Sequence, residues 1–213
     1  MKKSKLLLLA FCAALIVVAT VFSTLAYLTD SSKVVNKFTV GKVDLKLDET
    51  AVDANGKATS GRTEEGNKYH LVPGMTYVKD PTVTVIAGSE ESYVRLLVTV
   101  NCYDALTDIF GDPFLPQYFV SGWDSATWVS TQVIDIDDTA DTATYEFRYK
   151  SKVKPEGTDD LVLDALFDSI TVPANLTGAQ LEKIAKLEIN IEAHAIQAAG
   201  FDDADHAWVA FTK

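Results

Sequence analysis

The sequence predicts an all-β domain, an antiparallel two-sheet sandwich with short helical insertions and a short C-terminal helix. About eight short segments alternate apolar and polar residues with the period of two that is typical of strands. Turns containing Pro or Gly separate these segments, as at Pro73-Gly74 and Gly111-Asp112-Pro113. Segments with helical spacing are few and short. Because each short strand buries one face, two stacked antiparallel sheets are the expected arrangement.

The first predicted strand covers residues 43–48, where Val43, Leu45 and Leu47 alternate with charged residues. Residues 49–68 are polar and carry a turn signal at 53–56, which predicts a surface loop or the end of a hairpin. The strongest strand pattern lies at 93–103, where both faces contain apolar residues, as expected of a central strand. Further extended segments are predicted at 76–79, 81–87, 128–136, 142–150, 170–172 and 187–195.

Helical spacing is predicted in four short segments. Single turns are expected at residues 105–110 and 181–186, and a short helical segment at 163–169. After residue 195 the period changes, and Ala204, Ala207, Trp208 and Phe211 follow at helical spacing. Asp202 is the predicted cap of this last helix, which we expect to fold back against the sheets.

The first 26 residues have the pattern of an export signal. Three lysines precede an uncharged apolar segment at 6–25, and Thr24 and Ala26 occupy the two small positions of a processing site. Cleavage is therefore predicted between Ala26 and Tyr27. The apolar segment is also long enough to span a bilayer as an uncleaved anchor, which needs roughly 20 residues. Both alternatives place residues 27–213 outside the cytoplasm, with 27–35 as a leader and 36–213 as one domain.

The predicted mature chain is strongly acidic. The formal net charge of the whole sequence is −11, and removal of the three lysines of the signal takes it to −14. Such a surface repels nucleic acid, so nucleic acid is excluded as a partner. Only Cys102 remains after cleavage, which leaves no intramolecular disulfide.

No catalytic constellation emerges from the sequence. It contains neither His-Glu-x-x-His nor Gly-x-Ser-x-Gly, and its three histidines lie far apart. His194 and His206 could approach each other as a metal pair, although two solvated histidines on an acidic surface are the simpler interpretation. We therefore expect no enzyme activity and no cofactor.

Two clusters suggest binding and also have plainer explanations. Four carboxylates near a predicted hairpin tip offer hard oxygen ligands for Ca²⁺, although such carboxylates are more often solvated: Asp135, Asp137, Asp138 and Asp141. Four neighbouring aromatic residues could form a sugar-stacking platform, although core packing is the expected role: Tyr118, Phe119, Trp123 and Trp128.

The N-terminal junction resembles that of the TasA/camelysin family, exported proteins of Gram-positive bacteria that a SipW-type signal peptidase releases. The resemblance rests on residues 24–30 (TLAYLTD) and 36–45 (NKFTVGKVDL). Residues 71–74 (LVPG), 79–81 (KDP) and 193–201 (AHAIQAAGF) are also similar to the family. The match covers both ends and the first third of the chain. The metalloprotease activity implied by the camelysin name is not expected, because the sequence offers no zinc motif for it.

The resemblance implies a jelly-roll sandwich and a structural role in extracellular fibres or biofilm matrix. In fibre-forming relatives the freed N-terminal segment adds as a strand to the next subunit. Here the donor would be residues 27–35, with Tyr27, Leu28, Val34 and Val35 as its apolar anchors. Self-association, the signal peptidase and a minor assembly protein are the implied partners. The alternative function is a monomeric or membrane-tethered surface module that binds a ligand or host protein.

Overall fold

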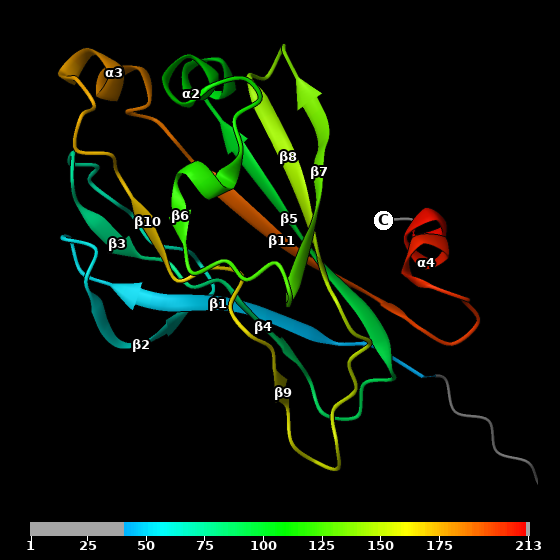
Figure 1. The fold of residues 1–213 in the computed structure, drawn as a ribbon. Coiled ribbons are helices and arrows are strands. Elements are labelled where there is room, and N and C mark those ends of the chain that lie inside the picture. The colour runs from blue at the N-terminus through cyan, green and yellow to red at the C-terminus, as the bar shows by residue number, and fades with distance from the viewer. Residues whose placement is uncertain (1–40, 212–213) are drawn as a thin grey trace, which may run out of the picture. The chain divides into compact units, whose positions relative to one another are not determined.

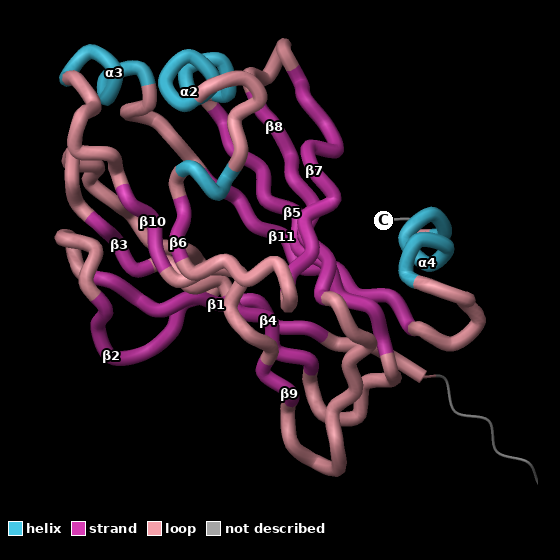
Figure 2. Tube along the Cα trace, viewed as in Figure 1, coloured by secondary structure: helices cyan, strands magenta, loops and turns pink. Residues whose placement is uncertain are grey.

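The computed structural model describes residues 41–211, apart from the side chains of 132–134, and forms one compact unit over this range (Figure 1). The predicted signal, the Ala26–Tyr27 junction and the donor segment 27–35 lie outside the described residues. Eleven strands are described, and short helices connect some of them (Figure 2). Within residues 41–211, none of the helices has the length and apolar content that crossing a membrane requires.

The strands form three antiparallel sheets. The first has the order β2 (Ala58–Thr63), β1 (Leu45–Val52), β4 (Thr82–Val85) and β9 (Leu161–Val162). The second has the order β3 (Thr76–Val78), β10 (Ser169–Thr171) and β6 (Val120–Ser121). The third has the order β11 (Ile189–Gln197), β5 (Ser92–Asn101), β8 (Thr142–Tyr149) and β7 (Trp128–Asp137).

One hydrophobic core joins all three sheets. Its largest contribution comes from β5, where Val94, Leu96, Val98 and Val100 are almost completely buried. Val83 and Val85 of β4 belong to the same core, as do Tyr77 of β3 and Ile170 of β10. The third sheet therefore packs with one face against the other two, and the predicted all-β sandwich is confirmed, with one of its layers divided into two sheets.

The strand periodicity explains which side chains enter this core. In β8, Tyr145 and Phe147 point inward, and the intervening Glu146 points to the outer face, as the alternation predicts. Tyr145 also donates a hydrogen bond of 2.5 Å to the carbonyl of Phe114, which satisfies its buried hydroxyl. The β7–β8 hairpin and the central position of β5 are both as predicted.

The turn between β1 and β2 depends on one glycine. Asp53 accepts hydrogen bonds from the amides of Asn55 and Lys57, and Gly56 follows with φ +73°. A Cβ at position 56 would lie 2.1 Å from the ring of Tyr77, so only glycine fits between this turn and β3. The polar segment predicted as a loop or hairpin end is therefore a hairpin.

Short helices lie outside the strands. They are α2 (Tyr103–Phe110), the 3₁₀ turn η1 (Pro116–Tyr118), α3 (Gly178–Lys183) and α4 (Ala204–Ala210). Thr177 caps α3 through a capping box with Gln180. The cap of α4 is Asp203, one residue after the predicted Asp202, because the carboxylate of Asp203 accepts the amide of His206.

The helix predicted at residues 163–169 is wrong. Leu163, Leu166 and Phe167 have helical spacing and are buried, but the chain there is irregular. The amide of Leu163 donates to the carbonyl of Val83, and that of Leu166 donates to Pro81. These bonds tie the segment alongside β4 and leave its amides unable to form a helical ladder.

The outer face of the third sheet carries a buried charge network. Glu146 is 3% exposed and accepts hydrogen bonds from Arg95 (3.0 Å) and Thr131 (2.7 Å), and Arg148 forms an ion pair with it at 3.0 Å. Helix α4 covers this network, with Trp208 and Phe211 lying over the guanidinium of Arg95 at 4.4 and 5.0 Å. The terminal helix therefore folds back against a sheet, as predicted.

Candidate functional site

Strand β11 lies at an edge of the third sheet. It pairs with β5 over its whole length, and within residues 41–211 no strand pairs with its other side. The amide of Asn101 donates to the carbonyl of Glu188, which makes these two residues a hydrogen-bonded pair. Because such pairs alternate in an antiparallel ladder, residues 189, 191, 193 and 195 direct their backbone groups toward the open edge.

The opposite edge of the same sheet is protected. Strand β7 has register shifts on either side of Val133, and irregular pairing of this kind twists an edge away from regular hydrogen bonding. Charged Asp135 and Asp137 lie near its end, which further disfavours strand addition. The pairing of β11 is regular over all nine residues, so β11 is the long edge that remains able to accept a strand.

A groove begins beside the start of β11. It has a volume of about 1040 Å³ and lies between residues 65–71 on one side and residues 184–190 with α3 on the other. Apolar side chains form much of its lining: Tyr69, Leu71, Phe119, Ile170, Leu181, Ile184, Leu187 and Ile189. Ile189 and Ile191 are only partly buried, whereas Val98 and Val100, their neighbours on β5, are fully buried. The core is therefore incompletely covered at this edge.

A second hollow continues the groove toward β1. It has a volume of about 180 Å³ and is lined by β1, the end of β2 and the start of β11. Five residues line both hollows: Glu65, Gly66, Lys79, Ile189 and Asn190. The two hollows therefore form one continuous groove, called the edge groove below, between β11 and the sheet that contains β1.

A buried ion pair forms part of the wall of the edge groove. The ammonium of Lys79 lies 2.6 Å from the carboxylate of Glu49, and both side chains are less than a tenth exposed. The amide of Asn67 donates to the second oxygen of Glu49 at 2.8 Å. Tyr69 lies beside the pair, and burial together with the charge of Glu49 raises the pKa of its hydroxyl. Such a pair fixes the local arrangement of β1, β3 and the 65–71 segment.

A second charge network supports the β1 side of the groove. Arg62 of β2 binds both Asp48 and Asp80, and Lys46 lies 2.9 Å from Asp48. Burial by itself would raise the pKa of Asp48 and of Asp80. Hydrogen bonds from Arg62, with Lys46 at Asp48 and Thr50 at Asp80, outweigh burial and hold both pKa values below the ordinary 3.8.

This network predicts a specific pH dependence. A carboxyl group with a lowered pKa in the folded state stabilises the fold above its unfolded pKa, and the stabilisation is lost as the pH falls through the folded pKa. The Arg62→Gln variant should therefore be less stable than wild type at pH 7, and the difference should shrink below about pH 4. Urea unfolding of both proteins between pH 7 and pH 2 measures this difference in stability. The exposed Lys183→Gln is the control and should show no such convergence with wild type.

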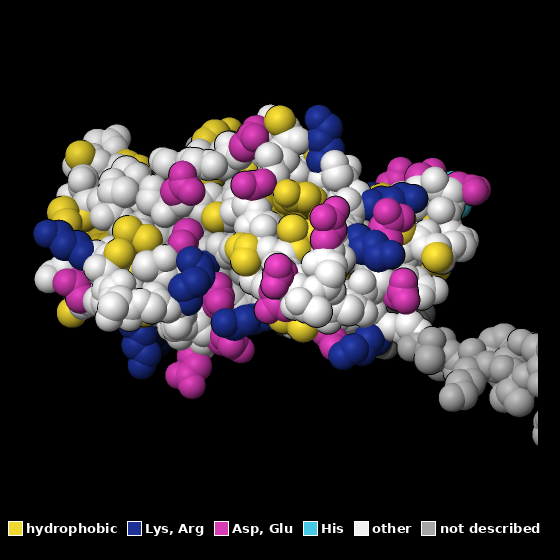
Figure 3. All heavy atoms as spheres, turned by 90° about the horizontal axis from the view of Figure 1, so that it is seen from below, with side chains coloured by type: hydrophobic (Ala, Val, Ile, Leu, Met, Phe, Trp, Pro, Cys, Tyr) yellow, Lys and Arg dark blue, Asp and Glu magenta, His cyan; other side chains and the backbone are white. Residues whose placement is uncertain are grey.

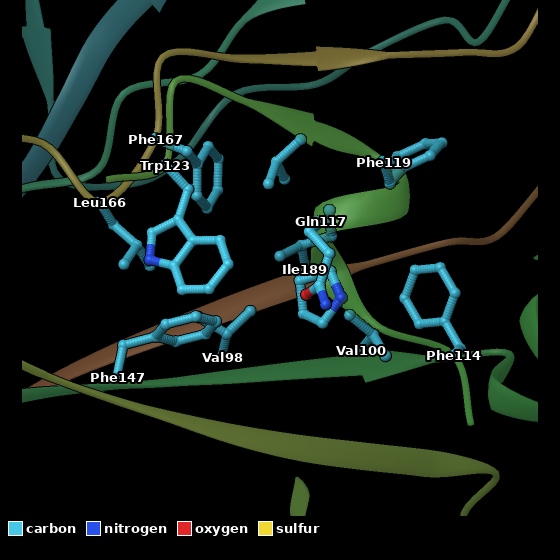
Figure 4. A pocket seen from close by; sticks show the side chains of 12 residues that line it. Val98, Val100, Phe114, Gln117, Phe119, Trp123, Phe147, Leu166, Phe167 and Ile189 are labelled. Atoms are coloured by element: carbon cyan, nitrogen blue, oxygen red, sulfur yellow. The ribbon is translucent and has the colours of Figure 1, made fainter. Parts of the chain in front are cut away.

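A small apolar pocket lies deeper between the layers (Figure 4). Trp123, Phe147, Val98 and Phe119 converge on it, and its volume is about 20 Å³, enough for roughly one water molecule. Trp123 donates its indole N–H to the carbonyl of Trp128 and packs edge-on to Phe147. We interpret this pocket as part of the core, because it is too small for a ligand.

The four aspartates predicted as calcium ligands lie around the β7–β8 hairpin. Asp137 accepts the amides of Thr139 and Ala140 at the turn, and Asp141 accepts the amide of Asp104. These bonds give both side chains a structural role. Over the described part of the chain, no group of three or more His, Cys, Asp or Glu side chains is arranged to hold a metal ion.

The two candidate histidines occupy separate surroundings. His194 lies on the outer face of β11, where its ring stacks on Phe211 at 4.9 Å and accepts a hydrogen bond from Arg95. His206 lies in α4 and contacts Asp203 at 2.8 Å. Of the aromatic cluster, Phe119 and Trp128 are buried in the core, Trp123 is half-buried, and Tyr118 is exposed. Core packing is therefore the main role of these aromatic residues.

The edge groove itself could not be read from the sequence. Lys79 and Glu49 meet only because β1 pairs with β4, and β4 directly follows Lys79 and Asp80. The one sequence signal was the strong alternation of the last strand, which predicted β11 but not its place at an edge. Charged side chains are interspersed over the face of the domain seen in Figure 3, with no single large apolar area there.

Comparisons with protein-family models, with curated proteins and with solved structures yield no match.

Proposed function

We propose that this chain is a secreted structural protein that forms extracellular fibres by strand exchange. Residues 27–35 of one copy, freed by removal of the signal segment, add to the open edge of β11 in the next copy and fill its edge groove. The observation that carries the proposal is the long, regular, unpaired side of β11 beside a partly apolar groove. Assembly would take place at the cell surface or in the biofilm matrix.

The physical basis is strand addition. Backbone groups of residues 189, 191, 193 and 195 are directed to the open edge, where an incoming strand can satisfy them. Apolar side chains of the same strand would complete the cover over Ile189 and Ile191. Each copy supplies one donor segment and one acceptor edge, so contacts run head to tail and do not close on themselves. A filament is the expected product.

The proposal predicts that assembly requires the leader. A chain that begins at Tyr27 should sediment as large species, and replacing residues 27–35 by a Gly/Ser segment of equal length should leave monomers. Ala193→Pro should also block assembly, because proline removes one amide from the open edge without touching the bonds to β5. Thermal unfolding of each monomer checks that its fold is intact. A strictly monomeric wild-type chain at all concentrations would favour the alternative, a monomeric or membrane-tethered surface module.

A further inference from the structure

The edge groove has two chemically different ends, and the donor segment has two matching ends. Taking strand exchange between copies as the function, we propose that the donor strand runs parallel to β11. Its Tyr27 end would occupy the apolar part of the groove beside α3, and Lys33 would occupy the acidic part beside β1. The occupant is the 27–35 segment of a second copy.

The end of the groove beside α3 is apolar and nearly neutral. Leu71, Leu181, Ile184 and Leu187 line it, together with Phe119 and Ile170. Its charged lining is balanced, with three carboxylates and three lysines: Glu65, Glu182, Glu188, Lys68, Lys79 and Lys186. This end suits the aromatic side chain of Tyr27, and it offers a charged side chain no net attraction.

The end beside β1 is acidic. The lining of the second hollow contains four carboxylates and one lysine: Asp48, Glu49, Glu64, Glu65 and Lys79. Adding the ion partners Lys46, Arg62 and Asp80 still leaves five carboxylates against three cations. Glu64 is largely exposed, with a single ion pair to Lys46 at 3.5 Å. A cation on an incoming strand is therefore attracted to this end.

Two residues of the donor suit the two ends of the groove. Lys33 is the only basic residue in 27–35, and it lies six residues after Tyr27. An even separation places both side chains on the same face of a strand, roughly 20 Å apart. Leu28, Asp30 and Val34 fall on the opposite face, so the charge of Asp30 does not enter the acidic end.

The direction follows from the order of the two ends along β11. Residues 184–190 line the apolar hollow, and Ile189, Asn190 and Ile191 line the acidic one, so the apolar hollow begins before the strand and the acidic hollow extends further along it. A donor that places Tyr27 first and Lys33 second therefore advances in the same direction as β11. Parallel pairing supplies evenly spaced, slanted hydrogen bonds to an open edge.

Disulfide cross-linking of assembled protein tests this direction without changing any charge. In a Cys102→Ser background, each chain carries one donor cysteine, Thr29→Cys or Val35→Cys, and one groove cysteine, Ala185→Cys or Thr63→Cys. Positions 29 and 35 share the face of Tyr27 and Lys33. The expected result is interchain cross-linking of 29 with 185 and of 35 with 63. The pairs 29 with 63 and 35 with 185 serve as matched controls. They lie roughly 20 Å apart in the parallel arrangement and should not form.

The other outcomes distinguish a failure of the proposed strand direction from a failure of strand exchange itself. Cross-linking of the control pairs would show strand exchange with the opposite direction. Cross-links within one chain would show that the leader fills its own groove, which overturns a second copy as the occupant. Assembly without any of these cross-links would overturn the edge groove as the acceptor. Failure of the wild-type chain to assemble would overturn strand exchange itself.

Charge reversal provides a second readout. Lys33→Glu should slow assembly about tenfold, and adding Glu64→Lys to the same chain should restore part of the rate. The control Lys42→Glu reverses an exposed lysine that does not line either hollow, and it should leave the rate unchanged. An equal effect of Lys33→Glu and Lys42→Glu would contradict local recognition at the acidic end.

Discussion

Replacing Lys79 by methionine is expected to lower the free energy of unfolding by about 3 to 5 kcal/mol. The substitution removes the only cation that pairs with Glu49 among the described residues and leaves an unpaired carboxylate that is only 5% exposed. Asn67 still donates to Glu49, but one neutral donor does not replace the charge. Urea unfolding at pH 7 measures the loss. The control Lys183→Met breaks an exposed pair and should cost less than about 1 kcal/mol.

A double variant separates the ion pair from the burial of its side chains. Lys79→Met combined with Glu49→Met replaces two buried charges by apolar groups, and it should recover most of the lost stability. If the double variant is as unstable as the single variant, the wild-type pair does more than neutralise a buried charge. The assembly rate of the same double variant tests whether the pair contributes to strand exchange.

The second large effect is expected at Arg95. Arg95→Ala removes one of the two arginines that hold buried Glu146, and it removes the cation that lies between β5 and the rings of Trp208 and Phe211. We expect a loss of about 3 kcal/mol, from the buried ion pair and the two cation–π contacts together. The amides of helix α4 should also lose protection from hydrogen exchange, because the exposed Asp205 is then the remaining link between the helix and the charge network.

Hydrogen exchange of the α4 amides measures that local effect directly. Arg95→Ala should raise the exchange rates of residues 204–210 more than those of β8. Arg95→Lys is the matched variant, because it keeps the charge and loses the planar stacking on the two rings. It should preserve more of the global stability than the alanine variant. Unchanged exchange in α4 after Arg95→Ala would contradict the role of Arg95 in holding the helix.

Local alternation predicted the strands because each strand here buries one face. In β5 the buried residues follow the period of two from Val94 to Val100, and in β8 they follow it from Ala143 to Phe147 apart from Glu146. Both strands lie where they were predicted. The failure at 163–169 has a tertiary cause. The spacing of Leu163, Leu166 and Phe167 is helical, but β4 supplies hydrogen bonds that the local pattern cannot reveal. Whether such a segment becomes helical therefore depends on hydrogen-bond partners that are distant in the sequence.

The candidate site was the least predictable part of the molecule. A groove at a sheet edge depends on which strand has no neighbour. The alternation within one strand does not reveal the order of the strands in the sheet. Glu146 shows the same limit, because its position on the outer face was predicted and its burial was not. Arg95 and Arg148 cover it from two different strands.

The irregular pairing of β7 bears on the shape of any assembly. A subunit with two receptive sheet edges would join more than one incoming strand and act as a branch point. In the third sheet, the register shifts and the aspartates of β7 leave β11 as the long edge that can receive a strand, so under the proposed strand exchange this sheet accepts one strand. The irregular pairing of one strand would then keep this sheet from acting as a branch point.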